Sequence, residues 1–163
     1  RIKNPGTDKE ENEMGFQQEY DRFWDGFGTH KKMVLSTALH GIVTSRMMSM
    51  VVLNKNLYFQ TDRTSRKYAQ LKGNKNISLC IDNIQIEGLC EESGIPAQNR
   101  EFSSAYREYF PGSYDRYTLL ENERLFAIKP TFIERWIYVE GIPYMESFDV
   151  LNEKYALERY EGV

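Results

Sequence analysis

The sequence predicts a mainly β domain with peripheral helices. Two apolar segments, Lys32–Leu39 and Ile42–Leu53, flank a His-Gly pair that suits a tight turn, so they predict a β-hairpin. Segments Asn76–Asp82 and Ile84–Glu92 repeat this arrangement around a short polar turn. A chain of 163 residues fits one domain with a single core. We therefore expect residues 13–163 to form one mostly antiparallel domain.

Composition excludes several classes of protein. The chain has 21 basic and 24 acidic residues, and its net charge of −3 gives no general attraction to nucleic acid. No apolar run approaches the roughly 18 residues of a membrane span, so no membrane partner is predicted. Two cysteines without a CxxC pair, together with two histidines, indicate neither a zinc site nor a disulfide framework. We expect a cytoplasmic protein in which Cys80 is a buried thiol.

The N-terminal part divides into a polar lead-in and a helix. Residues 1–12 lack apolar periodicity and predict a mobile segment. From Met14 onwards, aromatic residues recur at helical spacing, and Gly28 ends the pattern. These aromatic residues are Phe16, Tyr20, Phe23, Trp24 and Phe27. We expect this stripe to pack on the barrel itself and to close one end of it; covering a cofactor is the alternative.

A helix after the short strand Leu57–Thr61 carries an unusual charge pattern. The helix is expected to begin near Thr64 and to end at Lys72, with Gly73 as a left-handed cap. Two cations lie in its first turn, where the helix dipole disfavours positive charge unless an anion compensates. Free backbone N–H groups at that end favour anions as well. A phosphate held by Arg46, Thr61, Ser65, Arg66 and Lys67 would explain the pattern; ordinary solvated surface charges are the alternative.

The C-terminal half predicts one helix and three strands before a final helix. Aromatic residues at helical spacing before Pro111-Gly112 predict the first helix, and Pro130 is expected to end a strand. The first helix is predicted at Glu101–Phe110 and the final helix at Asn152–Tyr160. The three strands between them are predicted at Arg124–Lys129, Phe132–Glu140 and Tyr144–Asp149.

An ordered set of motifs resembles the pyridoxamine 5′-phosphate oxidase family. The set runs Arg46-Met47-Met48, Leu57–Thr61, Ser65-Arg66-Lys67 and Asn76–Leu79, after a first strand that begins at Lys32. The resemblance covers residues 30–90 well and the rest in outline. It implies an FMN-binding split β-barrel, Greek-key-like and antiparallel. It also implies a homodimer with FMN at the subunit interface and a small-molecule substrate.

The resemblance also implies which residues bind FMN. Arg46, Ser65, Arg66 and Lys67 would hold the phosphate. The backbone of the strand at Met47, Met48, Ser49 and Met50 would pair with the flavin edge, beside Gln60 and Thr61. An amide side chain would reach the pyrimidine edge; Gln85 is the candidate and Asn83 the alternative. No residue stands out as an acid or base.

Residues that bind the substrate phosphate in the classical oxidases are missing. Where the family has its lysine, this chain has Val51. Where the family has its arginine, this chain has Ser113 or Gly112, and where it has its serine, this chain has Tyr117. The C-terminal Arg-x-His segment has no counterpart. We therefore expect a divergent FMN-dependent oxidoreductase. The alternatives are an FMN storage or sensing protein, and a haem- or deazaflavin-binding relative with His30 and His40 as its available imidazoles.

Overall fold

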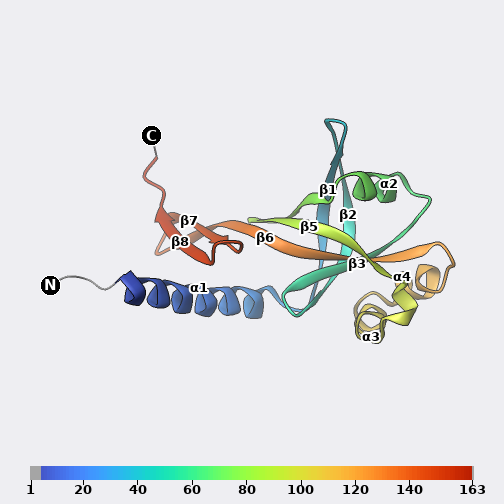
Figure 1. Ribbon diagram of the computed structural model, residues 1–163, viewed down its shortest axis with the longest axis horizontal. Helices are drawn as coiled ribbons and strands as arrows, with labels where there is room; N and C mark the ends of the chain where they lie inside the picture. Colours follow the sequence, from blue (N-terminus) through green and yellow to red (C-terminus); the bar gives the residue numbers. More distant parts are fainter. Residues whose placement is uncertain (1–4, 163) are drawn as a thin grey trace.

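The chain folds around one antiparallel sheet that closes into a barrel. The computed structural model describes the backbone of residues 5–162 and the side chains of residues 15–162 (Figure 1). Six strands form the closed barrel, because β3 pairs with β6 at the far end of the strand order β3-β2-β1-β4-β5-β6. Their bounds are β1 (His30–Leu39), β2 (Ile42–Leu53), β3 (Asn56–Asp62), β4 (Asn76–Ile81), β5 (Ile84–Gly94) and β6 (Glu123–Val139). The predicted split β-barrel is confirmed.

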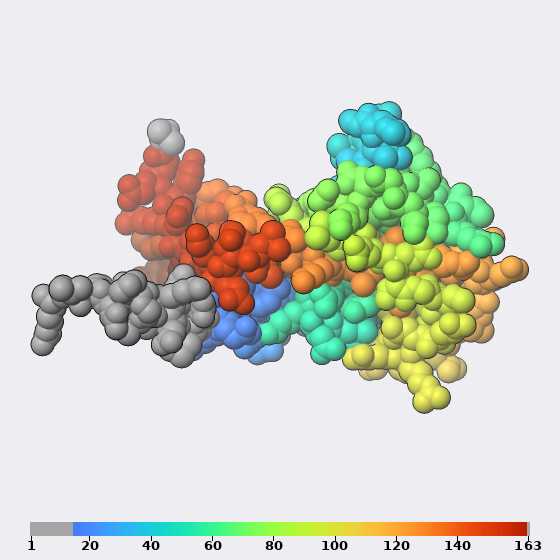
Figure 2. Space-filling model, in the orientation of Figure 1, coloured from blue at the N-terminus to red at the C-terminus, as the bar shows by residue number. Residues whose placement is uncertain are grey.

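The barrel is split where β2 and β3 separate. Strand β2 pairs with β1 from Ile42 to Val51 but with β3 only from Val51 to Leu53. Beyond that point β3 pairs with β6 instead, so the outer backbone edge of residues 42–50 has no strand partner within residues 5–162. The β1–β2 tip projects from the body of the molecule, in cyan in Figure 2. Tight turns with positive φ at His40 and Gly41 form this tip, as predicted.

An extension leaves the barrel along the second half of β6. Strands β7 (Ile142–Asp149) and β8 (Lys154–Arg159) add to it as antiparallel neighbours, and α1 (Pro5–Phe27) lies along it (Figure 1). The five aromatic residues of α1 are 2–7% exposed, and Phe23 contacts Phe148 of β7 with ring centroids 5.4 Å apart. The stripe therefore packs on the sheet, but along the extension at β7 and β8, not across one end of the barrel as predicted. Of the predicted lead-in, residues 1–4 lie outside the described residues and residues 5–12 are helical; its mobility stays a prediction.

Helix α3 (Arg100–Tyr109) covers the outer face of β2 and β6. It follows the short turn η1 (Pro96–Gln98) and precedes α4 (Pro111–Ser113) and η2 (Tyr114–Thr118). A cluster separate from the barrel core holds it in place, with members Val51, Phe102, Tyr106, Phe110 and Leu125. The barrel core is built from inward side chains, among them Met33, Leu35, Met50, Phe59, Leu79, Ile86 and Phe126.

Two predictions about the C-terminal half were wrong. Pro130 does not end a strand, because β6 continues through it. A register shift in the pairing of β5 with β6 places Pro130 opposite Gly88, and a residue without an N–H is tolerated at such a bulge. The expected final helix Asn152–Tyr160 is instead β8. Pairing with β7 overrides the helical propensity of its Ala, Leu and Glu residues, and Tyr155 packs on Phe148 at 5.1 Å.

Two further predictions about single residues were wrong. Gly73 is the last residue of α2 (Arg66–Gly73), not a left-handed cap; a Cβ there would lie 2.6 Å from Cδ1 of Leu39, so the glycine permits close packing on β1. Cys80 is exposed, because its neighbour Leu79 occupies the inward position of the alternating strand. The buried thiol is Cys90, and burial raises its pKa to about 12. None of the helices in residues 5–162 combines the length and apolarity needed to span a bilayer.

Gly88→Ala should destabilise the barrel. The new Cβ would meet Cγ2 of Ile128 at 2.8 Å and the backbone oxygen of Lys129 at 2.9 Å, so the strands must move apart. We expect the free energy of unfolding to fall by about 1–3 kcal/mol in urea titration. The control Gly26→Ala adds a Cβ to open space on α1 and should not destabilise the protein. Equal unfolding midpoints for Gly88→Ala and the wild type would contradict the assigned packing.

Candidate functional site

A pocket of about 280 Å³ lies at the split of the barrel. One wall is the β2 edge at Met47, Met48 and Ser49, and the opposite wall is the end of β3 at Gln60, Thr61 and Asp62. Tyr106, Ser113, Tyr117, Lys67 and Glu123 complete it. Because β3 has left β2 here, the β2 backbone groups along this edge have no strand partner among the described residues. The pocket is therefore bordered by free backbone N–H and C=O groups, with which a flat polar ring could form hydrogen bonds.

The turn into α2 is fixed by side-chain caps. Asp62 Oδ1 accepts from the Thr64 hydroxyl and from the Thr64 backbone N–H, each at 2.6 Å, and these two hydrogen bonds lower the pKa of Asp62. Ser65 is the N-cap, since its Oγ accepts from the backbone N–H of Tyr68 at 3.2 Å. The Thr61 and Ser65 hydroxyl oxygens are 3.3 Å apart. The predicted hydroxyl pair is thus assembled at the beginning of the helix.

Three cations gather at the same place. The pKa of Arg46 is lowered by burial and then by the charge of Arg66, and the pKa of Lys67 is lowered by burial and then by Arg46. Within residues 15–162, none of the three forms an ion pair with a carboxylate. Their mutual repulsion therefore makes this cluster, named here the cation cluster (Arg46, Arg66 and Lys67), a place where an anion would be stabilised.

Arg46 is held in position by neutral acceptors. Its guanidinium donates to Thr37 Oγ1 at 2.7 Å, to Gln70 Oε1 at 3.0 Å and to the hydroxyl of Thr44. Thr37 and Gln70 are buried. This network joins β1, β2 and α2, so it fixes the guanidinium without neutralising its charge.

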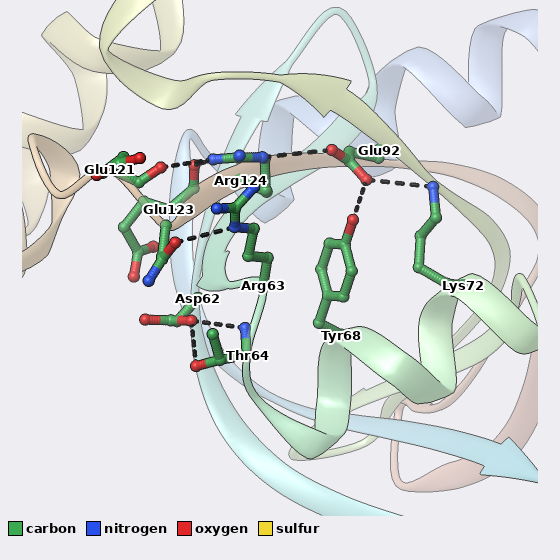
Figure 3. A network of polar contacts seen from close by, with 10 residues as sticks. Asp62, Arg63, Thr64, Tyr68, Lys72, Glu92, Glu121, Glu123 and Arg124 are labelled. Atoms are coloured by element: carbon green, nitrogen blue, oxygen red, sulfur yellow. Dashed lines mark hydrogen bonds and ion pairs between the residues drawn. The ribbon is translucent and has the colours of Figure 1, made fainter.

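The network around Glu92 holds the rest of α2 in place (Figure 3). The Glu92 carboxylate accepts from the Tyr68 hydroxyl at 2.8 Å and from Lys72 Nζ at 3.2 Å, and it lies 3.6 Å from Nε of Arg124. Tyr68 and Lys72 belong to α2, Glu92 to β5 and Arg124 to β6. Helix α2 is therefore tied to two barrel strands through Tyr68 in its first turn and Lys72 in its last, which keeps its beginning at the pocket.

Gln60, a residue of the pocket wall, carries an unpaired buried donor. The residue is 6% exposed; its Oε1 accepts from Thr118 Oγ1 at 2.9 Å, and no described residue accepts from its Nε2. A buried donor without a partner costs roughly 1–3 kcal/mol. Because the Nε2 atom is itself shielded from solvent, an acceptor in the pocket would reach it only if the Gln60 side chain turned towards the pocket.

Glu123 is a titratable group that sequence reasoning missed. It is 5% exposed at the beginning of β6, and burial, followed by the nearby charge of Asp62, raises its pKa to about 7, with Lys67 acting in the opposite direction. Only the pairing of β6 with β3 places it there, opposite Asp62. No motif in the sequence marks this position.

The remaining predicted residues are dispersed. Met47 is 60% exposed and Met48 is half-buried at the pocket, where Lys67 Nζ lies 3.2 Å from the Met48 sulfur, while the Met50 side chain points into the barrel core. Gln85 lies on β5 beside other cavities, and Asn83 donates to the backbone oxygen of Trp136. A single chain does not bring either amide to the pocket. Within residues 15–162, no three His, Cys, Asp or Glu side chains form a group that could hold a metal ion.

Comparisons with solved structures show the same fold. PhzG from Burkholderia lata 383, in complex with tetrahydrophenazine-1-carboxylic acid, is 15% identical with a TM-score of 0.56, covering 99% of this chain and 98% of that chain. A pyridoxamine 5′-phosphate oxidase-related, FMN-binding protein from Nostoc punctiforme PCC 73102 is 14% identical with a TM-score of 0.53, covering 80% and 86%. HutZ, a haem storage protein from Vibrio cholerae, is 14% identical with a TM-score of 0.54, covering 72% and 86%. At these identities the likeness shows the fold alone.

The sequence comparisons show the family. No individually curated protein matches the chain. The profile of the family described as Pyridoxamine 5′-phosphate oxidase, however, matches residues 16–137, which is most of the chain and includes the whole closed barrel except the last two residues of β6. The chain therefore belongs to the pyridoxamine 5′-phosphate oxidase family.

Proposed function

We propose that the chain binds FMN and that the cation cluster holds the FMN phosphate. The observation that carries the proposal is the gathering of three cations at the first turn of α2, with no carboxylate pairing any of them within residues 15–162. The hydroxyls of Thr61 and Ser65 lie beside them and would add hydrogen bonds. Charge-assisted hydrogen bonds of roughly 1.5–3 kcal/mol each would make this the main anchor.

The flavin ring would lie in the pocket at the barrel split. The unpaired β2 edge from Met47 to Met50 would pair with its polar rim, and the Gln60 amide, once turned towards the pocket, would donate to one of its acceptors. When bound, FMN supplies hydride and electron transfer, while the protein supplies position and electrostatics. The most economical function is therefore an FMN-dependent oxidoreductase acting on a small molecule.

Oxidation of pyridoxamine 5′-phosphate itself is not part of the proposal. The residue at the position of the classical substrate lysine, Val51, is fully buried against α3 in the cluster with Phe102 and Tyr106. It therefore offers neither charge nor access. Ser113 and Tyr117, which replace the expected Arg and Ser, do not supply the guanidinium that a substrate phosphate would need there.

A homodimer with FMN at the subunit interface completes the proposal. Gln85 has no access to the pocket of its own chain, so a role at the flavin would need a second copy. Apolar side chains suited to an interface are exposed on the β1–β2 tip, where Val43 is 66% exposed, and on the extension, where Tyr138 is 72% exposed. A cytoplasmic location remains our expectation.

Simple measurements distinguish the alternative functions. A storage or sensing protein would bind FMN but show no reduction by NADH or NADPH and no reoxidation by an added acceptor. A haem protein would need an axial ligand; His40 lies at the exposed hairpin turn, and His30 stacks on Tyr109 with ring centroids 4.1 Å apart. A Soret band that disappears in a His30→Ala variant would favour haem. A deazaflavin would compete with FMN for the same cation cluster.

Replacing two members of the cation cluster should weaken FMN binding. For Arg66→Ala/Lys67→Ala we expect the dissociation constant, from quenching of flavin fluorescence, to rise at least about tenfold, because charge-assisted bonds to the phosphate are lost. The control Lys72→Ala removes a cation from the other end of α2, where it pairs with Glu92, and should change the affinity little. Unchanged affinity in the double variant would refute the phosphate assignment.

FMN binding should depend on the protonation of Glu123. Below pH 7 the carboxyl is mainly neutral; above it, a carboxylate adds negative charge to a pocket that already contains ionised Asp62 and offsets Lys67. Glu123→Gln should therefore match the wild type at pH 6 and bind FMN several-fold tighter at pH 8.5. Comparing both proteins at each pH cancels the titration of the FMN phosphate itself. Parallel pH profiles for the two proteins would contradict this role.

The purified protein should behave as a dimer. Light scattering coupled to size-exclusion chromatography should give twice the chain mass of 19.2 kDa. We expect Tyr138→Asp, which places a charge on the exposed apolar surface of the extension, to shift the mass towards the monomer. A mass of one chain at all concentrations would contradict the proposed homodimer.

A further inference from the structure

The carboxyl group of Glu123 is buried in the wall of the pocket at the barrel split but can be reached from the pocket. The residue is 5% exposed and lies at the beginning of β6, among the residues that line the pocket. Within residues 15–162, no side chain forms a hydrogen bond or an ion pair with its carboxylate. Its oxygens are not shielded from solvent, unlike the unpaired Nε2 of Gln60. Since the residue has almost no other exposure, these oxygens are open to a molecule in the pocket.

The other titratable groups of the pocket are less suited to binding a proton near neutral pH. They are Asp62 of β3, Lys67 of α2, Tyr106 of α3 and Tyr117 of η2. Asp62 already accepts two hydrogen bonds that lower its pKa, and burial raises the pKa of Tyr106, which keeps its hydroxyl protonated. Lys67 belongs to the cation cluster and contributes positive charge. The β2 wall contributes only methionine and serine side chains to the pocket. Glu123 is therefore the group of the pocket wall that is best placed to gain a proton.

The protonation of Glu123 responds to the charge around it. Burial, followed by the charge of Asp62, raises the pKa of Glu123 to about 7, and Lys67 acts in the opposite direction. The carboxyl is therefore divided between its two forms near neutral pH. A further negative charge in the pocket would act as Asp62 does and favour the protonated form, because the repulsion between like charges is strong where water is scarce.

Reduction of a flavin in the pocket would bring such a charge. A reduced nicotinamide delivers a hydride, which is two electrons and one proton, so the pocket gains one negative charge. A two-electron reduction that takes up two protons needs one more proton, and solvent supplies it. When this proton binds to a carboxylate oxygen of Glu123, an O–H bond forms and the net charge of the pocket returns to its value before reduction. Proton binding and reduction then favour each other by linkage.

We propose that Glu123 is the proton-binding residue of the flavin pocket, which takes up a proton when bound FMN is reduced and releases it when FMN is reoxidised. On reoxidation the hydride leaves, the O–H bond of Glu123 breaks and the carboxylate returns. The inference rests on the proposed function, because it requires FMN in the pocket. It goes beyond that function by naming the side chain that couples electron transfer to the pH of the solution.

The test measures the two-electron midpoint potential of bound FMN by spectroelectrochemistry between pH 5.5 and 9. The slope of this potential against pH counts the protons taken up, since each proton contributes about 30 mV per pH unit in a two-electron couple. Above pH 7 we expect the wild-type potential to fall about 30 mV per pH unit more steeply than that of Glu123→Gln. Near pH 5.5 the two slopes should coincide, because Glu123 is then protonated before reduction.

Two variants and one measurement on the wild type serve as controls. Glu121→Gln removes an exposed carboxylate outside the pocket and should keep the wild-type slope. Glu123→Asp keeps a carboxyl at this position and should keep the steeper slope. Infrared difference spectra of wild-type protein labelled with carbon-13 glutamate follow the same step without a substitution in the pocket. Reduction at pH 8 should produce a carboxylic acid band, and reduction at pH 5.5 should not.

Each outcome decides between the inference and its alternatives. Equal slopes for the wild type and Glu123→Gln above pH 7 would overturn this inference alone and leave FMN binding standing. A wild type that shows no carboxylic acid band on reduction at pH 8 would do the same, and this result remains decisive if Glu123→Gln does not fold. Failure of the wild type to bind FMN would overturn the proposed function and this inference with it.

Discussion

Repulsion among the three members of the cation cluster is the constraint on which the site depends. Folding brings Arg46, Arg66 and Lys67 together at the first turn of α2, where the helix dipole already disfavours positive charge. The surrounding contacts position the cations without forming an ion pair with them: Gln70 orients Arg46, and the Glu92 network ties α2 to the barrel. This repulsion raises the free energy of the folded chain when no ligand is bound, and a bound anion would lower it again.

The barrel split connects this electrostatic feature to the fold. Strand β3 leaves β2 after a short pairing and closes the barrel against β6, which frees the β2 edge and opens the pocket beside the cation cluster. The same pairing brings buried Glu123 into the pocket wall, while α3 covers the outer face of β2 and β6. The pocket, the free β2 edge and the cation cluster are consequently neighbours.

Local signals in the sequence predicted much of this arrangement. The hairpins, α2 and the aromatic face of α1 follow from turn residues and periodicity, and the five predicted phosphate-binding residues are contributed by β2, β3 and the beginning of α2. What the sequence could not predict depends on long-range pairing. Pro130 is tolerated only because it lies opposite Gly88, and β8 is a strand only because β7 is beside it. Likewise, the raised pKa of Glu123 and the unpaired amide of Gln60 arise from burial that no local pattern reveals.

The most direct test of the central claim compares FMN with riboflavin, which has the same ring and ribityl chain but no phosphate. If the cation cluster holds the phosphate, fluorescence titration should show FMN binding at least about a hundredfold tighter than riboflavin, because several charge-assisted bonds are absent from the second ligand. Raising the salt concentration should narrow this difference by screening the exposed charge of Arg66. Equal affinities for the two ligands would contradict the account.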